Sequence, residues 1–262
     1  MIYFVGTPIG NLEEITLRAL NVLKNSDVIF CEDTRHSAKL VNHYSLTAPL
    51  KSYHKFNEAK TAEYIISLSA NGKNVSIISD AGMPCISDPG ATLIKECIKA
   101  REAYTVISGA CAFVNAFIMS GFEIPFTFVG FLPQKNTDRD KLIERVINGG
   151  ALIFYSAPHD INDDLQYLYN TLGNRKVAVV KELTKIYENV NFFDLKNAQI
   201  ENPRGEYVIV VDKIPLSNAL NALSTKQHVD FYIDKGMTKM QAIKETAKDL
   251  GVTKNEIYKQ LL

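Results

Sequence analysis

The chain has 262 residues, and its 29 lysines and arginines balance 29 aspartates and glutamates, so the formal net charge is zero. Hydrophobic residues make up 46% of the chain and charged residues 22%, which is typical of globular proteins and excludes disordered, collagen-like and coiled-coil chains. Zero net charge also excludes a protein that holds nucleic acid through bulk charge alone, so any such contact must use a local basic surface.

The cysteines and histidines give no sign of a disulfide framework or a metal site. Cys31, Cys85, Cys97 and Cys111 form no C-x-x-C pair, and the histidines lack the spacing of metal ligands. The apolar N-terminal run has no basic segment before it, and the longest apolar stretch, residues 110–122, is too short to cross a bilayer. The sequence therefore predicts a soluble, cytoplasmic protein with no membrane partner and no metal.

Short apolar runs alternate with helical patterns through the first half of the chain. Helical periodicity covers residues 15–24 and 111–119, and Asp88-Pro89-Gly90 predicts the start of another helix, with Asp88 as its N-cap. This alternation is typical of an α/β fold with a parallel sheet. The apolar run at residues 2–5 predicts a buried strand, and further strands are predicted at residues 28–31, 75–78 and 104–107.

The pattern restarts after a strand predicted at residues 126–131, which we expect to be the last strand of a first domain. The length favours two medium domains over one, and the later strands partly alternate, so we predict a second α/β domain with some antiparallel pairing. Its predicted elements are helices at 139–147 and 161–172 and strands at 152–155, 177–180, 186–193 and 207–211. We expect α/β domains over residues 1–133 and 134–215 and a helical extension over 216–262, with Pro215 at the last boundary.

The C-terminal segment has helical periodicity interrupted by turns at residues 236–238 and 250–253. A helix, a short turn with glycine and another helix form the helix-turn-helix pattern. The seven lysines and five acidic residues from Lys226 onward give a net charge of +2, which is too small to argue for DNA binding. A three-helix bundle that aids dimerisation, or one that makes a modest RNA contact, fits this segment equally well.

Polar and glycine-rich segments follow the predicted strands of the first domain, at residues 6–10, 32–35, 79–82 and 108–110. Ligands of parallel α/β sheets bind beyond the carboxyl ends of the strands. Each segment alone is compatible with a simple turn. Four of them at the same edge favour an active crevice.

The first glycine loop, Gly6-Thr7-Pro8-Ile9-Gly10, is unlike known phosphate-binding loops. It lacks the G-x-G-x-x-G spacing of a dinucleotide fingerprint, Pro8 removes an amide donor, and no P-loop lysine follows. The loop therefore suits a ligand that presents no phosphate to it. Glu32 lies 32 − 10 = 22 residues beyond Gly10, where a nicotinamide enzyme places its ribose-binding acid, and this keeps a dehydrogenase as a weaker alternative.

Candidate chemical groups lie in three of the polar segments. Asp80, followed by two small residues, could bind hydroxyls or an amine of a ligand that lies against the backbone, although a turn-stabilising role is the alternative. Arg35 could hold a substrate phosphate, or it could pair internally with Asp33 or Glu32. His54 could titrate near neutral pH, although a lone histidine more often only donates or accepts a hydrogen bond.

Several stretches, in order along the chain, resemble one family. They are Gly6-Thr7-Pro8-Ile9-Gly10-Asn11-Leu12, Glu32 to His36, His54 with Asn57-Glu58, Ser79 to Gly90, Gly130-Phe131-Leu132-Pro133, Leu152 to Tyr155, Glu182-Leu183-Thr184-Lys185 and Gly205-Glu206. Together they closely resemble the tetrapyrrole methylase superfamily, and within it the branch that methylates ribose 2′-oxygens of ribosomal RNA. The resemblance covers residues 1–212, and the C-terminal segment is similar to that branch's extension.

The resemblance implies two α/β domains of the tetrapyrrole methylase type with S-adenosylmethionine bound in the cleft between them, and a homodimer. It implies methylation of a cytidine ribose in the decoding region of small-subunit rRNA, with naked rRNA or the 30S particle as the partner. From their positions at strand ends, Asp33 and His54 are the candidates for the base, and Arg35 is the candidate to hold a neighbouring phosphate. Matched motif by motif, the resemblance implies that nine residues contact the cofactor: Pro8, Asp80, Gly82, Met83, Cys111, Ala112, Phe154, Leu183 and Gly205.

Two segments depart from the family pattern. Ser108-Gly109-Ala110 stands where the family usually has Pro-Gly-Pro, and Ser156 and Asp160 replace a usual glutamate and arginine. Two further alternatives remain open at this point. One is methylation of a corrinoid or other tetrapyrrole precursor, and the other is a ligand-responsive helix-turn-helix regulator that binds nucleic acid.

Overall fold

The computed structural model of the chain describes residues 1–55, 57–213, 220 and 223–261. Its first lobe is a five-stranded sheet of order β3-β2-β4-β1-β5, in which every pairing is parallel. The parallel sheet confirms the predicted α/β class. The strands are β1 (Ile2–Val5), β2 (Val28–Cys31), β3 (Leu50–Ser52), β4 (Val75–Ile77) and β5 (Tyr104–Ile107).

Helices cover both faces of the first sheet, which is why its central strands are apolar on both sides. Ala19 and Leu23 of α1 and Leu40 of α2 pack on one face. Ile65 of α3 and Leu93 of α4 pack on the other. The bounds are α1 (Leu17–Lys24), α2 (Thr34–His43), α3 (Glu58–Ala70) and α4 (Ala91–Ala100).

The second lobe is a five-stranded mixed sheet of order β6-β7-β10-β8-β9. β6 and β7 are parallel and the remaining pairs are antiparallel, as the partial alternation predicted. Apolar residues of α6 (Asn136–Val146) and α7 (Ile161–Leu172) pack on one face, and α5 (Ala112–Ser120) packs on the other. The strands are β6 (Phe126–Phe131), β7 (Ala151–Ser156), β8 (Lys176–Lys181), β9 (Asn189–Asp194) and β10 (Tyr207–Val211).

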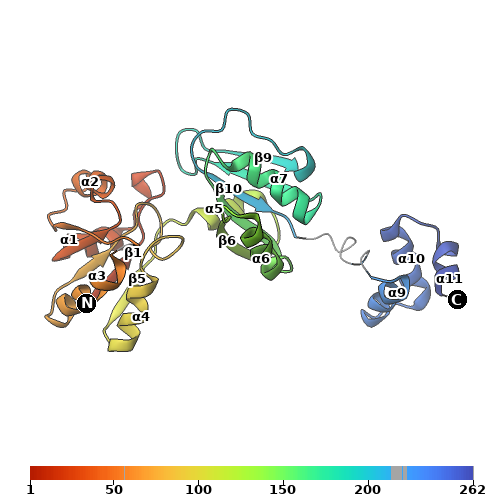
Figure 1. Cartoon of the computed structure of the whole chain (residues 1–262), viewed down its shortest axis with the longest axis horizontal. Coiled ribbons are helices and arrows are strands. Elements are labelled where there is room, and N and C mark those ends of the chain that lie inside the picture. Colours follow the sequence, from red (N-terminus) through yellow and green to blue (C-terminus); the bar gives the residue numbers. More distant parts are fainter. Residues whose placement is uncertain (56, 214–219, 221–222, 262) are drawn as a thin grey trace.

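The strand predicted at residues 126–131 forms with these bounds but joins the second sheet, through its parallel pairing with β7. Its predicted place as the last strand of the first domain is therefore wrong. Helix α5 also packs on the second sheet, through Phe113 and Ala116. The chain thus crosses from one lobe to the other between β5 and α5, beside the carboxyl ends of the first sheet (Figure 1). Pro215, the predicted later boundary, lies outside the described residues.

The described part of the tail forms the predicted helices α9 (Thr225–Asp234), α10 (Lys239–Leu250) and α11 (Lys254–Leu261), which share a core around Val229, Ile243 and Ile257. Ser224 and Thr238 cap α9 and α10 in reciprocal capping boxes. The bundle lies apart from the two sheets in Figure 1. Among the helices that the structure describes, none is long and apolar enough to cross a membrane.

Candidate active site

A cavity of about 390 Å³ lies between the two lobes. Its volume falls in the range of small-molecule sites. One wall comes from the loops beyond β1 and β4, and the opposite wall from α5 and the second sheet. The lining residues are Ile9, Asp80, Ala81, Gly82, Met83, Ile86, Ser87 and Asp88 on the first wall, and Cys111, Ala112, Phe131, Tyr155, Ser156, Ala157, Pro158, Val180, Leu183, Glu206, Tyr207 and Val208 on the second.

Backbone hydrogen bonds join the loops of the first wall. The N–H of Thr7 donates to the carbonyl of Gly82 at 2.9 Å, and the N–H of Gly82 donates to the carbonyl of Thr7 at 3.2 Å. The Asp80 carboxylate accepts the N–H of Asp33 at 3.2 Å, which links the loop after β4 to the end of β2. The predicted crevice at the strand ends is therefore present, and these bonds hold its edge.

Six of the residues predicted to contact the cofactor line this cavity. They are Asp80, Gly82, Met83, Cys111, Ala112 and Leu183. Pro8 does not line it, whereas its neighbour Ile9 does. Because neighbouring side chains along a strand point to opposite faces, Phe154 packs in the core under α7, and Tyr155 faces the cavity instead.

Gly205 also lies outside the cavity lining, and its backbone explains why the position holds glycine. Its φ angle is +81°, and an added Cβ would lie 2.5 Å from Cδ of Glu182. This close approach lets the N–H of Glu206 donate to Oε1 of Glu182 at 2.9 Å. Gly205 therefore shapes the wall through Glu206 and does not itself line the cavity.

The predicted catalytic residues Asp33, Arg35 and His54 are not among the residues that line the cavity. Nε and Nη2 of Arg35 donate to the two carboxylate oxygens of Asp33 at 3.1 and 2.8 Å, so the internal ion pair is the alternative that forms. Hydrogen bonds from Arg35 lower the pKa of the Asp33 carboxyl to about 2. The backbone N–H of His54 donates to Oδ1 of Asn57 at 2.8 Å.

The prediction that Asp88 caps a helix is wrong. Helix α4 begins at Ala91, and its N-cap, Gly90, has a φ angle of +133°. Oε1 of Glu58, at the start of α3, accepts the N–H groups of Gly90 at 2.9 Å and Thr92 at 3.2 Å. Because Glu58 accepts these N–H groups, Asp88 is not needed as a helix cap, and it lines the cavity instead.

Carboxylates gather at the first wall. Burial, together with the charges of Glu32 and Asp80, raises the pKa of the Asp88 carboxyl to about 7. Burial and the charge of Asp80 also raise the pKa of Glu32. This edge of the cavity is electrostatically negative and favours a positively charged ligand. Elsewhere the walls are largely apolar, with Ile9, Met83 and other aliphatic side chains.

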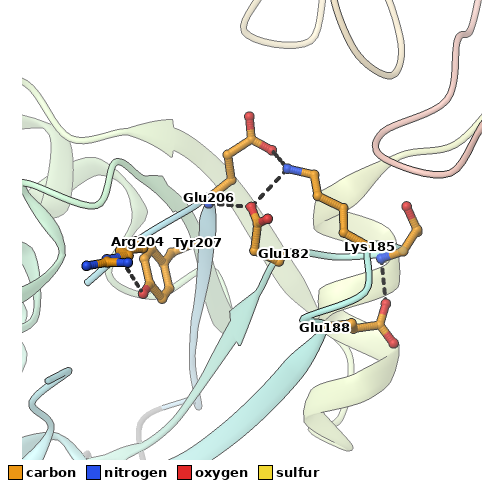
Figure 2. Close-up of polar contacts among 7 residues, drawn as sticks. Glu182, Lys185, Glu188, Arg204, Glu206 and Tyr207 are labelled. Atoms are coloured by element: carbon orange, nitrogen blue, oxygen red, sulfur yellow. Dashed lines mark hydrogen bonds and ion pairs between the residues drawn. The ribbon is translucent and has the colours of Figure 1, made fainter. Parts of the chain in front are cut away.

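An ion-pair cluster fixes the opposite rim (Figure 2). Nζ of Lys185 lies 2.9 Å from Oε1 of Glu182 and 2.8 Å from Oε2 of Glu206. Glu182 and Thr184 have φ angles of 50° and 65°, a left-handed backbone that is uncommon outside glycine. The cluster thus holds a strained turn beside Leu183 and Glu206, which line the cavity.

The structure also explains one departure from the family pattern. Oγ of the buried Ser156 donates to Oδ2 of Asp164 at 2.7 Å. Oδ1 of Asp164 pairs with Nη2 of the buried Arg139 at 3.1 Å. Sequence reasoning found neither Ser156 nor Tyr155 as a lining residue. Alternation along β7 carries the signal for Tyr155, which follows the core residue Phe154.

Comparisons with known proteins agree with this architecture. A family model described as Tetrapyrrole (Corrin/Porphyrin) Methylases matches residues 1–199, which include both walls of the cavity up to Leu183. The chain belongs to the tetrapyrrole methylase family. It is therefore a methyltransferase, as the resemblance in the sequence predicted.

Two relatives are similar over nearly the whole chain. The ribosomal RNA small subunit methyltransferase I of Halalkalibacterium halodurans is 41% identical, over 98% of this chain and 93% of the relative. The protein of the same name from Bacillus subtilis is 38% identical, over 98% of this chain and 92% of the relative.

Solved structures share the two-lobed fold. The uroporphyrin-III-C-methyltransferase of Thermus thermophilus aligns with a TM-score of 0.59, 18% identity, and coverage of 81% of this chain and 94% of that one. The methyltransferase CobJ aligns with a TM-score of 0.61 and 18% identity, over 81% of this chain and 93% of that one. At this identity the likeness concerns the fold alone.

Proposed function

We propose that this protein transfers a methyl group from S-adenosylmethionine to the ribose 2′-oxygen of a cytidine in the decoding region of small-subunit rRNA. The observation that carries the proposal is similarity over 98% of the chain to proteins named ribosomal RNA small subunit methyltransferase I. That similarity extends through the C-terminal helices, beyond the 199 residues that the broader family model matches.

The residues around the cavity fit S-adenosylmethionine. Its sulfonium and amine are positively charged, and Asp80 and Asp88 supply negative charge at the first wall. Its adenine ring needs apolar contact, which Met83, Leu183 and Val208 would provide. Bound there, the sulfonium supplies an activated methyl group, and the protein's part is to place the acceptor oxygen about 3 Å from it.

Arg35 is placed to contact the RNA backbone. Its side chain is 89% exposed, and its pairing with Asp33 uses Nε and Nη2 only. The remaining N–H groups of the guanidinium can donate to a phosphate without breaking the pair. Because the whole chain carries no net charge, we expect recognition of RNA shape, in naked rRNA or in the 30S particle, with weak binding of short free RNA.

We also propose that the enzyme works in the cytoplasm as a homodimer. Ile118 of α5 is 71% exposed and Phe126 of β6 is 37% exposed, and the ring of Phe117 lies 4.5 Å from that of Phe126. Exposed apolar side chains such as those of Ile118 and Phe126 support an interface. Sedimentation at micromolar concentration tests the dimer.

The direct test of the proposed function is ribose-methylation mapping by mass spectrometry. Small subunits that lack the modification are incubated with the protein and S-adenosylmethionine, and the rRNA is digested to nucleosides and fragments. We expect one 2′-O-methylcytidine in a decoding-region fragment. A methyl group on a base, or labelling of a tetrapyrrole precursor with none in rRNA, would contradict the proposal.

A further inference from the structure

We propose that Asp88 is the catalytic base, the carboxylate that accepts the proton of the ribose hydroxyl. The inference rests on the proposed function, because it needs a hydroxyl acceptor in the cavity. Its basis is geometric: Asp88 lines the cavity, and Glu58 has taken over the helix-capping role that the sequence suggests for Asp88.

The backbone around Asp88 is held in an unusual conformation. Cys85 and Ser87 have φ angles of 71° and 66°. Such angles cost energy in residues other than glycine and occur where surrounding structure fixes a functional geometry. The N–H of Cys85 donates to the carbonyl of Pro89 at 3.2 Å, which closes the segment around Asp88. The loop is therefore built as a fixed support, and Asp88 lies in the part of it that faces the cavity.

The charges around Asp88 suit a base that works at neutral pH. Burial raises the pKa of the Asp88 carboxyl most, and the negative charges of Glu32 beyond β2 and Asp80 beyond β4 raise it further, to about 7. Two further titratable groups near Asp88 are Cys85 and Tyr155 of β7, and the negative charge of Asp88 contributes to raising the pKa of each. A base is most effective when its pKa lies near the working pH, because it is then both available and strong.

The other carboxylates at the site are less suited to this task. Asp33 lies outside the cavity lining, and Arg35 holds its pKa at about 2. Asp80 accepts the N–H of Asp33 and so links two strand ends. Glu206 lines the cavity but pairs with Lys185 at 2.8 Å. Asp88 combines access to the cavity with a raised proton affinity.

The proposed step is balanced in atoms and charge. The ribose oxygen forms its bond to the methyl carbon while the bond from that carbon to sulfur breaks, and the bonding electron pair stays on sulfur. The proton leaves the hydroxyl for a carboxylate oxygen of Asp88. A sulfonium and a carboxylate are thereby converted to a neutral thioether and a neutral carboxylic acid, and solvent later takes up the proton.

The test compares Asp88→Asn with the wild-type protein and with Asp163→Asn, an exposed aspartate of α7, as the matched control. We expect Asp88→Asn to slow single-turnover methyl transfer to small subunits by at least about 100-fold. Calorimetry should show that the affinity for S-adenosylmethionine falls far less than the rate, by no more than about fivefold, because Asp80 still supplies negative charge at the first wall and the amide keeps the side chain's size. In the wild type the rate should rise with pH around 7, and this dependence should be absent from the variant.

A second readout does not depend on activity. Carbon-13 NMR of labelled aspartate carboxyls should show one resonance that titrates near pH 7 in the wild type and is absent in Asp88→Asn. Asp88→Glu, which keeps a carboxyl one methylene further out, should restore part of the rate and the pH dependence.

Failures of the two proposals can be told apart. Asp88→Asn activity within threefold of wild type, or the lack of a resonance that titrates near pH 7, would overturn the role of Asp88 while rRNA methylation stands. A wild-type protein that binds the donor but methylates no ribose would overturn the proposed function, and the role of Asp88 would fall with it.

Discussion

Gly6 and Gly109 touch through their backbones at the point where β1 and β5 end. A Cβ added at Gly109 would lie 2.7 Å from both Cα and the carbonyl carbon of Gly6. Gly109 is the middle residue of Ser108-Gly109-Ala110, the segment that departs from the family's Pro-Gly-Pro. The retained glycine is the one that the geometry requires, because it brings the β5 loop against the glycine loop after β1.

Replacing this glycine should damage the site. Because the atoms that a Cβ would meet are backbone atoms, Gly109→Ala must push the two loops apart, and we expect it to lower the free energy of unfolding by about 2 kcal/mol. Cofactor binding should weaken at least tenfold. Gly121→Ala is the control, because its Cβ would meet no atom within 4 Å and only its φ of +65° is unfavourable. Equal losses from the two substitutions in urea denaturation would contradict the steric account.

The Lys185 ion pairs should contribute more to stability than an exposed ion pair between β8 and β9. In Lys185→Met, the Glu182 carboxylate, whose side chain is only 17% exposed, loses its ammonium partner. We expect the free energy of unfolding to fall by about 1–2 kcal/mol. Calorimetry should also show a several-fold weaker affinity for S-adenosylmethionine, because Glu206, which lines the cavity, loses the ion pair that fixes its position. Lys176→Met removes the exposed Lys176–Asp194 pair and should cost less than about 0.5 kcal/mol. Unchanged S-adenosylmethionine affinity in Lys185→Met would show that these ion pairs are not needed to position the cavity rim.

Asp88 should make the protein less stable as the pH rises. Its folded-state pKa of about 7 exceeds the ordinary 3.8, so folding takes up a proton between these values. The stabilising effect of this proton is complete below pH 4 and disappears as the pH rises through 7. Because the carboxyl is partly exposed, we discount the full shift and expect Asp88→Asn to be more stable than wild type by about 1 kcal/mol at pH 8 and about equal at pH 4. Thermal melts at both pH values measure this, and a variant less stable at pH 8 would contradict it.

Glu58 should be important for stability although it lies outside the cavity lining. It accepts two N–H groups at the start of α4 and the hydroxyl of Tyr53 at 3.0 Å. We therefore expect Glu58→Ala to lower the free energy of unfolding by about 1–2 kcal/mol. Glu63→Ala, an exposed position on the same helix, is the control and should have little effect. Similar denaturation midpoints for the two variants would rule out this capping role.

Much of the fold could be predicted because its local signals are strong. The apolar runs that became β1, β2 and β10 have the predicted bounds, since largely buried strands need continuous apolar residues. The edge strand β5 also has its predicted bounds, although Val106 is exposed. The partner of β6 could not be predicted, because an apolar strand carries no mark of the sheet it joins. β3 was missed for a related reason: Lys51 and Ser52 are exposed at the sheet edge and give no apolar run.

The candidate site shows the same division. Glycine loops at strand ends located the first wall correctly, including Asp80, Gly82 and Met83. Asp88 was misassigned because Asp-Pro-Gly is a good local helix start, and only the fold brings Glu58, 30 residues away in sequence (88 − 58), to the same amides. A contact with a residue distant in sequence can thus override a local helix-start pattern, and such a contact is seen only in the three-dimensional structure.

The central claim is that the cavity between the lobes binds S-adenosylmethionine. Titration calorimetry of the wild-type protein and of Ala112→Arg, with circular dichroism to check folding, tests it most directly. Ala112 lines the cavity at the first position of α5, where a large cationic side chain would fill the space and repel a cationic ligand. We predict one donor molecule per chain with a micromolar Kd for the wild type and no binding by the folded variant. No binding heat from the wild type, or equal binding by the variant, would contradict the account.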